Sequence, residues 1–121
     1  MKGFTLIELL VVLSILAMLL SLSAPRYFHS IDASKEAVLA ENLHLARAAI
    51  DRFYADCGRY PESLDELVTR RYLRALPVDP VADNSTEWTL VAPPPRAEGR
   101  VADLKSRAGG VGRNGHPYAQ W

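Results

Sequence analysis

The sequence places one acidic residue, Glu8, inside an apolar segment that runs from Phe4 to Ala24. A charge at membrane depth costs at least about 2.5–3.5 kcal/mol at a helix centre, so an acidic residue there usually has a function. The chemistry open to this carboxylate is to pair with a positive group, because a buried ion pair is tolerated where a lone ion is not. The alternative is a protonated Glu8 that lies in the headgroup region without such a partner.

No other set of residues has the spacing of an active site, and we expect the protein not to be an enzyme. Ser, His and Asp all occur, but no Gly-x-Ser-x-Gly turn presents a nucleophile. The glycines at 109–112 lack the Lys-Ser/Thr step of a phosphate-binding loop. Asp65 and Glu66 are adjacent on a predicted helix, so their side chains do not share a face. We therefore expect no catalytic residues.

The apolar segment 4–24 is long enough to cross a membrane. As a helix of 21 residues it spans about 30 Å, the thickness of bilayer hydrocarbon. Ser14, Ser21 and Ser23 can donate their hydroxyl groups to the backbone of the same helix. Lys2 lies on the short leading side and places the N-terminus in the cytoplasm. We predict a single-pass helix in the inner membrane, followed by a periplasmic domain.

A cleaved secretory signal is the alternative interpretation of this segment. Residues 21–24 form a weak small-residue cleavage site. Pro25 follows that site directly and argues against ordinary signal cleavage there. The apolar stretch is also longer than the core of a typical signal peptide.

The run Gly3-Phe4-Thr5-Leu6-Ile7-Glu8 resembles the processing motif of type IV prepilins and of their secretion-system relatives, the pseudopilins. The resemblance implies that a prepilin peptidase removes residues 1–3 as a leader peptide by cutting between Gly3 and Phe4. It also implies N-methylation of Phe4. The amine created at Phe4 lies about one helical turn from Glu8. By the same resemblance, Glu8 acts in subunit assembly by pairing with the amine of a neighbouring subunit.

The chain is most similar to the major pseudopilin family of type II secretion, general secretion pathway protein G. This implies an α+β pilin-like fold, in which a long N-terminal helix with a transmembrane half and an amphipathic half packs on a small antiparallel sheet. The implied function is a homopolymeric periplasmic pseudopilus that drives export of folded periplasmic proteins. The implied partners are minor pseudopilins, the prepilin peptidase and an inner-membrane assembly platform powered by a cytoplasmic ATPase.

Composition limits the rest of the chain to one small domain, residues 25–121. The 121 residues carry 14 basic and 14 acidic side chains, which gives no electrostatic case for nucleic-acid binding. Cys57 is the only cysteine, so an intrachain disulfide is excluded. We expect a buried, inert thiol; an intermolecular disulfide is the alternative.

An amphipathic helix is predicted over residues 31–57. Pro25, just before it, would remove a backbone hydrogen bond, and we expect a helix kink there. Gly58 is placed to end the helix. Apolar positions spaced 4, 3, 4, 3 and 4 residues apart form one face: Leu39, Leu43, Ala46, Ile50, Phe53 and Cys57.

A variable loop at 58–85 and a hairpin with a C-terminal loop at 86–121 complete the prediction. Ser63 and Glu66 have capping-box spacing, which predicts a short helix through about Arg70. The prolines at 77 and 80 then favour an extended chain. This stretch is similar to the variable loop of the major pseudopilin. Strands are predicted at 87–91 and 100–105, separated by three consecutive prolines.

The glycine-rich tail departs from the resembled family. That family closes this region with a glycine-rich loop and a final aromatic residue, often around a calcium ion held by carboxylates and carbonyls. Here no Asp or Glu follows Asp103, whereas calcium requires six to eight oxygen ligands and usually some carboxylate charge. Asn114 and backbone carbonyls would form only a weak site, so we expect no cofactor and no tightly bound metal.

Two other functions remain open. One is a true type IV pilin, serving adhesion, motility or DNA uptake; the single cysteine disfavours it, because many such pilins close a C-terminal loop with a disulfide. The other is a membrane-anchored periplasmic binding domain that never polymerises. A simple anchor gains nothing from Glu8, so replacement of Glu8 distinguishes an anchor from an assembling subunit.

Overall fold

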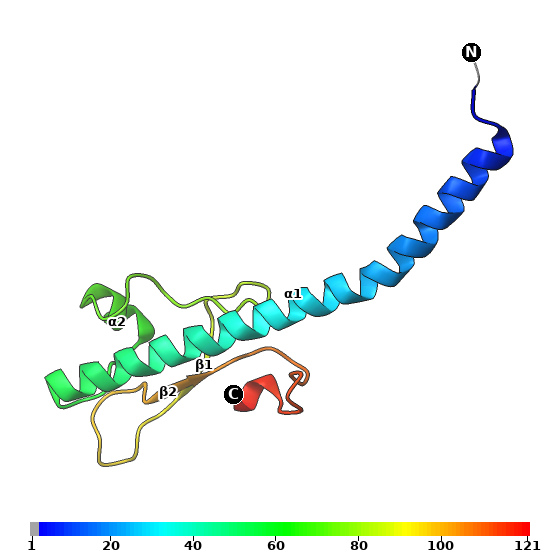
Figure 1. Ribbon diagram of the computed structural model, residues 1–121. Coiled ribbons are helices and arrows are strands. Elements are labelled where there is room, and N and C mark those ends of the chain that lie inside the picture. Colours follow the sequence, from blue (N-terminus) through cyan, green and yellow to red (C-terminus); the bar gives the residue numbers. More distant parts are fainter. Residues whose placement is uncertain (1–2) are drawn as a thin grey trace. The chain divides into compact units, whose positions relative to one another are not determined.

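The computed structural model describes residues 3–121, with side chains at 3–26 and 31–121. Helix α1 spans Leu6–Cys57 and contains Pro25 (Figure 1). The chain divides into two compact units, one ending at Ser34 and one spanning Lys35–Trp121. The single long helix with a small antiparallel sheet confirms the predicted α+β pilin-like fold class.

The core of the second unit forms on the predicted face of α1. Leu39, Leu43, Ala46, Ile50 and Phe53 are all buried. The core is completed by Ala49 and by buried side chains from the rest of the unit: Leu64, Leu67, Trp88, Val101 and Leu104. Full burial of an aliphatic or aromatic side chain of this size contributes about 1.5–3 kcal/mol, so this face holds the unit together.

Cys57 differs from the prediction of a buried thiol. It is the last residue of α1 and is only half-buried. Gly58 follows with a φ of 70°, and its N–H donates to the Tyr54 carbonyl at 2.9 Å. A positive φ is accessible to glycine without a Cβ clash. The predicted helix end at Gly58 is confirmed, and the end of the apolar stripe lies at the edge of the core.

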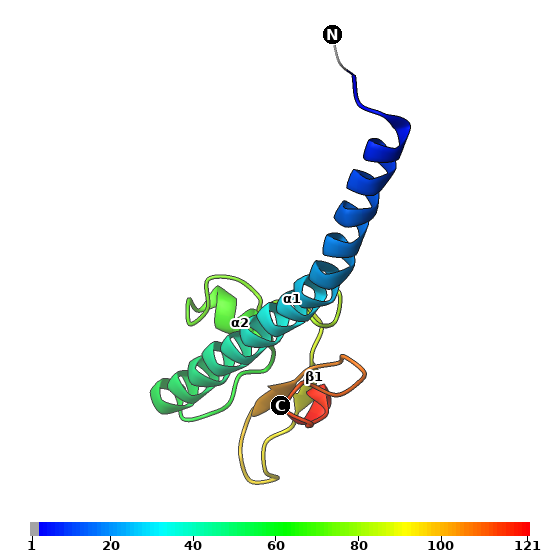
Figure 2. The ribbon, with the colours of Figure 1, turned by 45° about the vertical axis from the view of Figure 1, so that its right-hand side comes forward.

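Helix α2 spans Leu64–Thr69 and lies beside α1 within the second unit (Figure 1 and Figure 2). Ser63 is its N-cap residue, as the sequence predicts. The following loop is held by two side chains that donate to its carbonyls. Asn42 Nδ2 donates to Val78 O at 2.6 Å, and Trp88 Nε1 donates to Pro77 O at 2.9 Å.

The sheet contains strands β1, Thr89–Val91, and β2, Asp103–Lys105, paired antiparallel with Leu90 opposite Leu104. Both strands are shorter than predicted. Before β2, where the predicted strand would begin, the N–H groups of Arg100 and Val101 donate to Pro61 O instead of to β1. Before β1, the Glu87 N–H donates to Ser85 Oγ. These bonds compete with the ladder and shorten it.

Candidate functional site

The N-terminal segment carries the predicted processing and assembly residues. Gly3, Phe4 and Thr5 precede α1 and are not helical. Phe4 is 89 % exposed, and a Cβ placed on Gly3 would meet no atom within 4 Å. The backbone around the predicted cleavage point is therefore open within this unit. The rest of the predicted leader, Met1 and Lys2, lies outside the described residues. Cleavage and methylation stay predictions.

Glu8 lies in the first turn of α1 and bonds to Thr5, the residue just before the helix. The Glu8 N–H donates to Thr5 Oγ1, and the Thr5 N–H donates to Glu8 Oε2, both at 3.1 Å. These reciprocal bonds form a capping box, which satisfies two N–H groups that the helix start would leave without partners. Sequence reasoning missed this contact, although Thr5 and Glu8 have the same spacing as Ser63 and Glu66.

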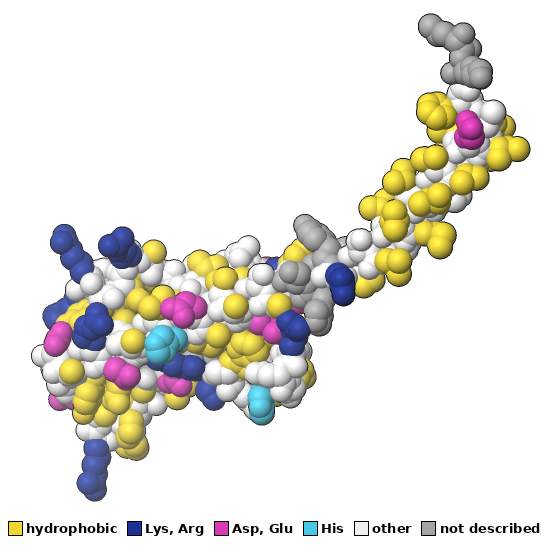
Figure 3. All heavy atoms as spheres, in the orientation of Figure 1, with side chains coloured by type: hydrophobic (Ala, Val, Ile, Leu, Met, Phe, Trp, Pro, Cys, Tyr) yellow, Lys and Arg dark blue, Asp and Glu magenta, His cyan; other side chains and the backbone are white. Residues whose placement is uncertain are grey.

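The helix that follows Glu8 presents apolar side chains outward. Leu6 and Ile7 are 75 % and 73 % exposed, and the large side chains between Leu9 and Leu22 are 49–75 % exposed. Figure 3 shows hydrophobic side chains over the visible face of this segment. The helix is long and apolar enough here to cross a membrane. Such a surface requires lipid or protein to cover it.

The serines in this segment behave as predicted. The hydroxyl groups of Ser14, Ser21 and Ser23 donate to the carbonyls of Leu10, Ala17 and Leu19 at 2.8, 2.8 and 3.1 Å. Each hydroxyl is therefore satisfied by its own helix and needs no water. Pro25 lies within α1, and the kink predicted there stays a prediction.

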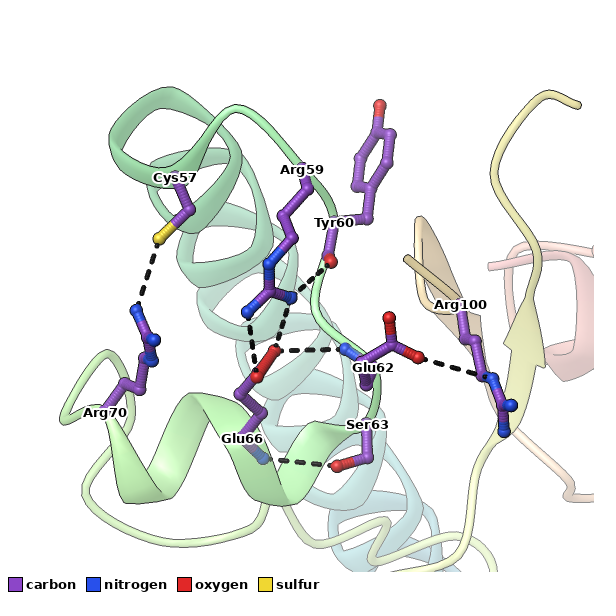
Figure 4. Close-up of polar contacts among 8 residues, drawn as sticks. All are labelled: Cys57, Arg59, Tyr60, Glu62, Ser63, Glu66, Arg70 and Arg100. Atoms are coloured by element: carbon purple, nitrogen blue, oxygen red, sulfur yellow. Dashed lines mark hydrogen bonds and ion pairs between the residues drawn. The ribbon is translucent and has the colours of Figure 1, made fainter. Parts of the chain in front are cut away.

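A polar cluster lies in the turn that connects α1 to α2 (Figure 4). Arg59 Nη1 and Nη2 donate to Glu66 Oε1 and Oε2 at 2.9 and 3.2 Å. The hydrogen bond from Arg59 lowers the pKa of Glu66, and the same bond raises the pKa of Arg59. Ser63 Oγ accepts from the Glu66 N–H at 3.3 Å, while the carboxylate accepts from the Glu62 N–H at 3.1 Å.

This cluster stabilises the turn between α1 and α2, and its charged side chains are paired with one another. Both partners of the Arg59–Glu66 pair are largely covered, whereas the nearby pair of Arg100 and Glu62 is open to solvent. Cys57 joins the cluster through Arg70, whose Nη1 donates to Cys57 Sγ at 3.6 Å. Within the described residues, no three His, Cys, Asp or Glu side chains are grouped to hold a metal ion.

The model of the prokaryotic N-terminal methylation motif matches residues 1–24. Type II secretion system core protein G of Pseudomonas aeruginosa is 34 % identical over 95 residues, covering 65 % of this chain and 67 % of that protein.

Two further relatives have the same name. That of Pectobacterium carotovorum is 30 % identical over 108 residues, 76 % of this chain and 67 % of that protein. That of Klebsiella michiganensis is 26 % identical over 136 residues, 99 % of this chain and 92 % of that protein. No solved structure matches.

Proposed function

Because this chain belongs to the family of type II secretion system core protein G, we propose that it is a structural subunit of a type II secretion pseudopilus. The filament polymerises from the inner membrane and drives export of folded periplasmic proteins. The observation that carries the proposal is the N-terminal segment, an exposed apolar helix that begins at a processing motif and contains one carboxylate. The role is structural and not catalytic.

The proposal includes the subunit's partners and location. The chain assembles with copies of itself and with minor pseudopilins, after processing by a prepilin peptidase and delivery to an inner-membrane assembly platform. The apolar helix holds the unassembled subunit in the inner membrane, and residues 35–121 fold in the periplasm. The positive charge of Lys2, on the short leading side, supports this orientation.

Cleavage between Gly3 and Phe4 gives Glu8 its partner. The new amine on Phe4 is positively charged, and a buried carboxylate is tolerated when it is paired. The capping box engages Glu8 Oε2, and an ionised carboxylate has two oxygens with about four lone-pair sites. Glu8 can therefore cap its own helix and accept from the amine of a neighbouring subunit in the filament.

Three variants separate capping from pairing. Glu8→Leu removes both, whereas Glu8→Gln keeps an acceptor for the Thr5 N–H and removes the charge. We expect both variants to remain in the membrane and to lose filament formation, measured as sheared or pelleted polymer. Thr5→Ser keeps the cap and serves as the matched control, with filament yield near that of the wild type. Wild-type yield from Glu8→Gln would restrict Glu8 to capping and contradict the assembly role.

Intact-mass analysis of protein extracted from membranes tests the processing steps directly. The expected mass lacks residues 1–3 and includes one added methyl group. A Gly3→Leu variant should retain the full leader and stay out of filaments. An unprocessed wild-type chain in assembled filaments would contradict the proposal.

A further inference from the structure

The C-terminal loop, residues 106–121, does not fit the calcium site that the family resemblance implies. No Asp or Glu occurs in it, and calcium takes six to eight oxygen ligands with carboxylates among them. Its own oxygens already accept protein N–H groups. Gly112 O accepts from the Gly115 N–H at 3.0 Å, and Asn114 Oδ1 accepts from the His116 N–H at 3.0 Å. His116 O accepts from both the Gly112 N–H and Trp121 Nε1.

Two charged residues of α1 hold this loop instead. Glu36 Oε1 accepts from the Arg113 N–H at 2.9 Å and from the Tyr118 hydroxyl at 2.7 Å. Arg47 Nη2 donates to Trp121 O at 2.6 Å. Residues eleven positions apart lie on the same side of a helix, about 16 Å from each other along its axis. Glu36 and Arg47 therefore fix the loop at two separate points.

Arg47 also joins the loop to the sheet. Its Nε donates to Asp103 Oδ1 at 2.8 Å, and its Nη2 donates to Leu104 O at 3.1 Å. One guanidinium thus connects α1, β2 and the last residue of the loop. A planar fork with several donors can make such contacts at once, which an ammonium group cannot reproduce with the same geometry.

The aromatic residues at the end of the loop close it. The Tyr118 and Trp121 rings have centroids 5.3 Å apart. A Cβ on Gly112 would come within 2.5 Å of Trp121 Cζ2, so the backbone at Gly112 lies directly against that ring. The loop is packed on itself by apolar contact and is tied to α1 at both fixed points.

We propose that Glu36 and Arg47 form a helix clasp that holds the C-terminal loop without a metal ion. The clasp takes the place that calcium has in the resembled family. A negative side chain supplied by α1 accepts from the loop, and a positive one donates to it. This inference concerns the folded subunit and does not depend on whether the chain assembles into filaments.

Limited trypsin digestion of the full chain in detergent micelles tests the clasp, with mass spectrometry following release of the peptide 114–121. The Arg113 N–H is bound to Glu36 in the closed loop. We therefore expect cleavage after Arg113 to require opening of the loop, with a rate that follows the open population when closing is fast. For the wild type, we expect the rate to stay within about twofold when EDTA or millimolar calcium is added. Glu36→Gln and Arg47→Gln should each raise it about tenfold, since each removes charge-assisted hydrogen bonds.

Matched controls come from the same helix. Glu41 and Arg52 are exposed, so Glu41→Gln and Arg52→Gln should leave the rate unchanged. Arg47→Lys should fall between the wild type and Arg47→Gln. Tyr118→Phe removes one bond to Glu36 without changing charge, and should raise the rate by a smaller factor than Glu36→Gln. This variant keeps the test decisive if a charge change disturbs folding.

Two results would overturn the clasp. One is faster cleavage of the wild type in EDTA, reversed by calcium, which would mean that a metal ion holds the loop. The other is a wild-type rate for Tyr118→Phe together with wild-type rates for both Gln variants.

Discussion

Replacement of Asp79 should destabilise the second unit strongly, although the residue takes no part in the proposed assembly chemistry. Its side chain is fully buried. Asp79 Oδ1 accepts from the N–H groups of Val81 and Ala82 at 3.0 and 3.2 Å, and Oδ2 accepts from the Ser106 hydroxyl. The carboxylate thus ties the variable loop to the chain just after β2.

The number of donors that lose their acceptor sets the expected loss of unfolding free energy. Asp79→Ala removes the partner of three donors, and a buried donor without a partner costs about 1–3 kcal/mol. Val81 and Ala82 are only half-buried, so water can reach their N–H groups and reduce the cost to a total of about 3–5 kcal/mol. Asp79→Asn keeps an oxygen for the two N–H groups and should cost about 1–2 kcal/mol.

Urea unfolding of the full chain in detergent micelles measures both variants. Trp88 is a suitable probe because it is buried and its Nε1 donates to Pro77, close to Asp79 in the chain. A unit the size of residues 35–121 has a stability of about 4–13 kcal/mol. Asp79→Ala should therefore lower the midpoint severely and Asp79→Asn moderately. Asp51→Ala, at an exposed position of α1, should change stability by no more than about 0.5 kcal/mol.

Equal midpoints for Asp79→Ala and the wild type would refute the argument that this carboxylate holds the two segments. Asp79→Asn as costly as Asp79→Ala would refute the argument from acceptor number, since charge alone would then set the stability.

Three further predictions follow from the second unit. The Tyr72 hydroxyl donates to Asp56 Oδ2 at 2.7 Å, and this bond raises the pKa of Tyr72 to about 12. Its stabilising contribution should persist below pH 10 and disappear as the pH rises toward 12; Asp56→Asn should lower the pKa in an absorbance titration. The hydrogen bond from Arg59 lowers the pKa of Glu66. The pair therefore stabilises the folded unit fully above the ordinary carboxyl pKa, and this stabilisation is lost as the pH falls through the lowered pKa. Arg59→Gln should raise the pKa of Glu66 measured by carboxyl NMR. Phe53→Ala should cost about 3–5 kcal/mol in calorimetry, and Phe53→Leu much less, because the ring is fully buried.

The spacing of residues in the sequence correctly predicted the buried face of α1 and the boundaries of the helices. The apolar stripe from Leu39 to Phe53 appears as the buried face of α1, because helical periodicity determines which side chains can reach a core. Ser63 and Gly58 lie at the predicted helix boundaries, since a cap and a positive φ depend on neighbouring residues alone.

Contacts between distant residues could not be predicted from the sequence. Arg47 is separated by 74 positions from Trp121, and Asp79 by 27 positions from Ser106. No local signal identifies which carbonyl a helix arginine reaches. The observed strand ends differ from the predicted ones for the same reason. Pro61 O accepts from the N–H groups of Arg100 and Val101, which would otherwise have extended β2. Thr5 and Glu8 are different, because their spacing was a sufficient local signal for the capping box.

The two units differ in what they require from their surroundings. The core of the second unit is covered by its own chain, whereas the large apolar side chains between Leu6 and Leu22 stay exposed. Lipid tails and apolar side chains cover such a surface about equally well, so moving it from bilayer to filament gives little hydrophobic driving force. Glu8 is the group in this segment for which the two environments differ, because under the proposed function the Phe4 amine of a neighbouring subunit lies beside it only in the filament. Under the proposed function, this one carboxylate therefore sets the register of assembly, while the apolar helix supplies a surface suited to either environment.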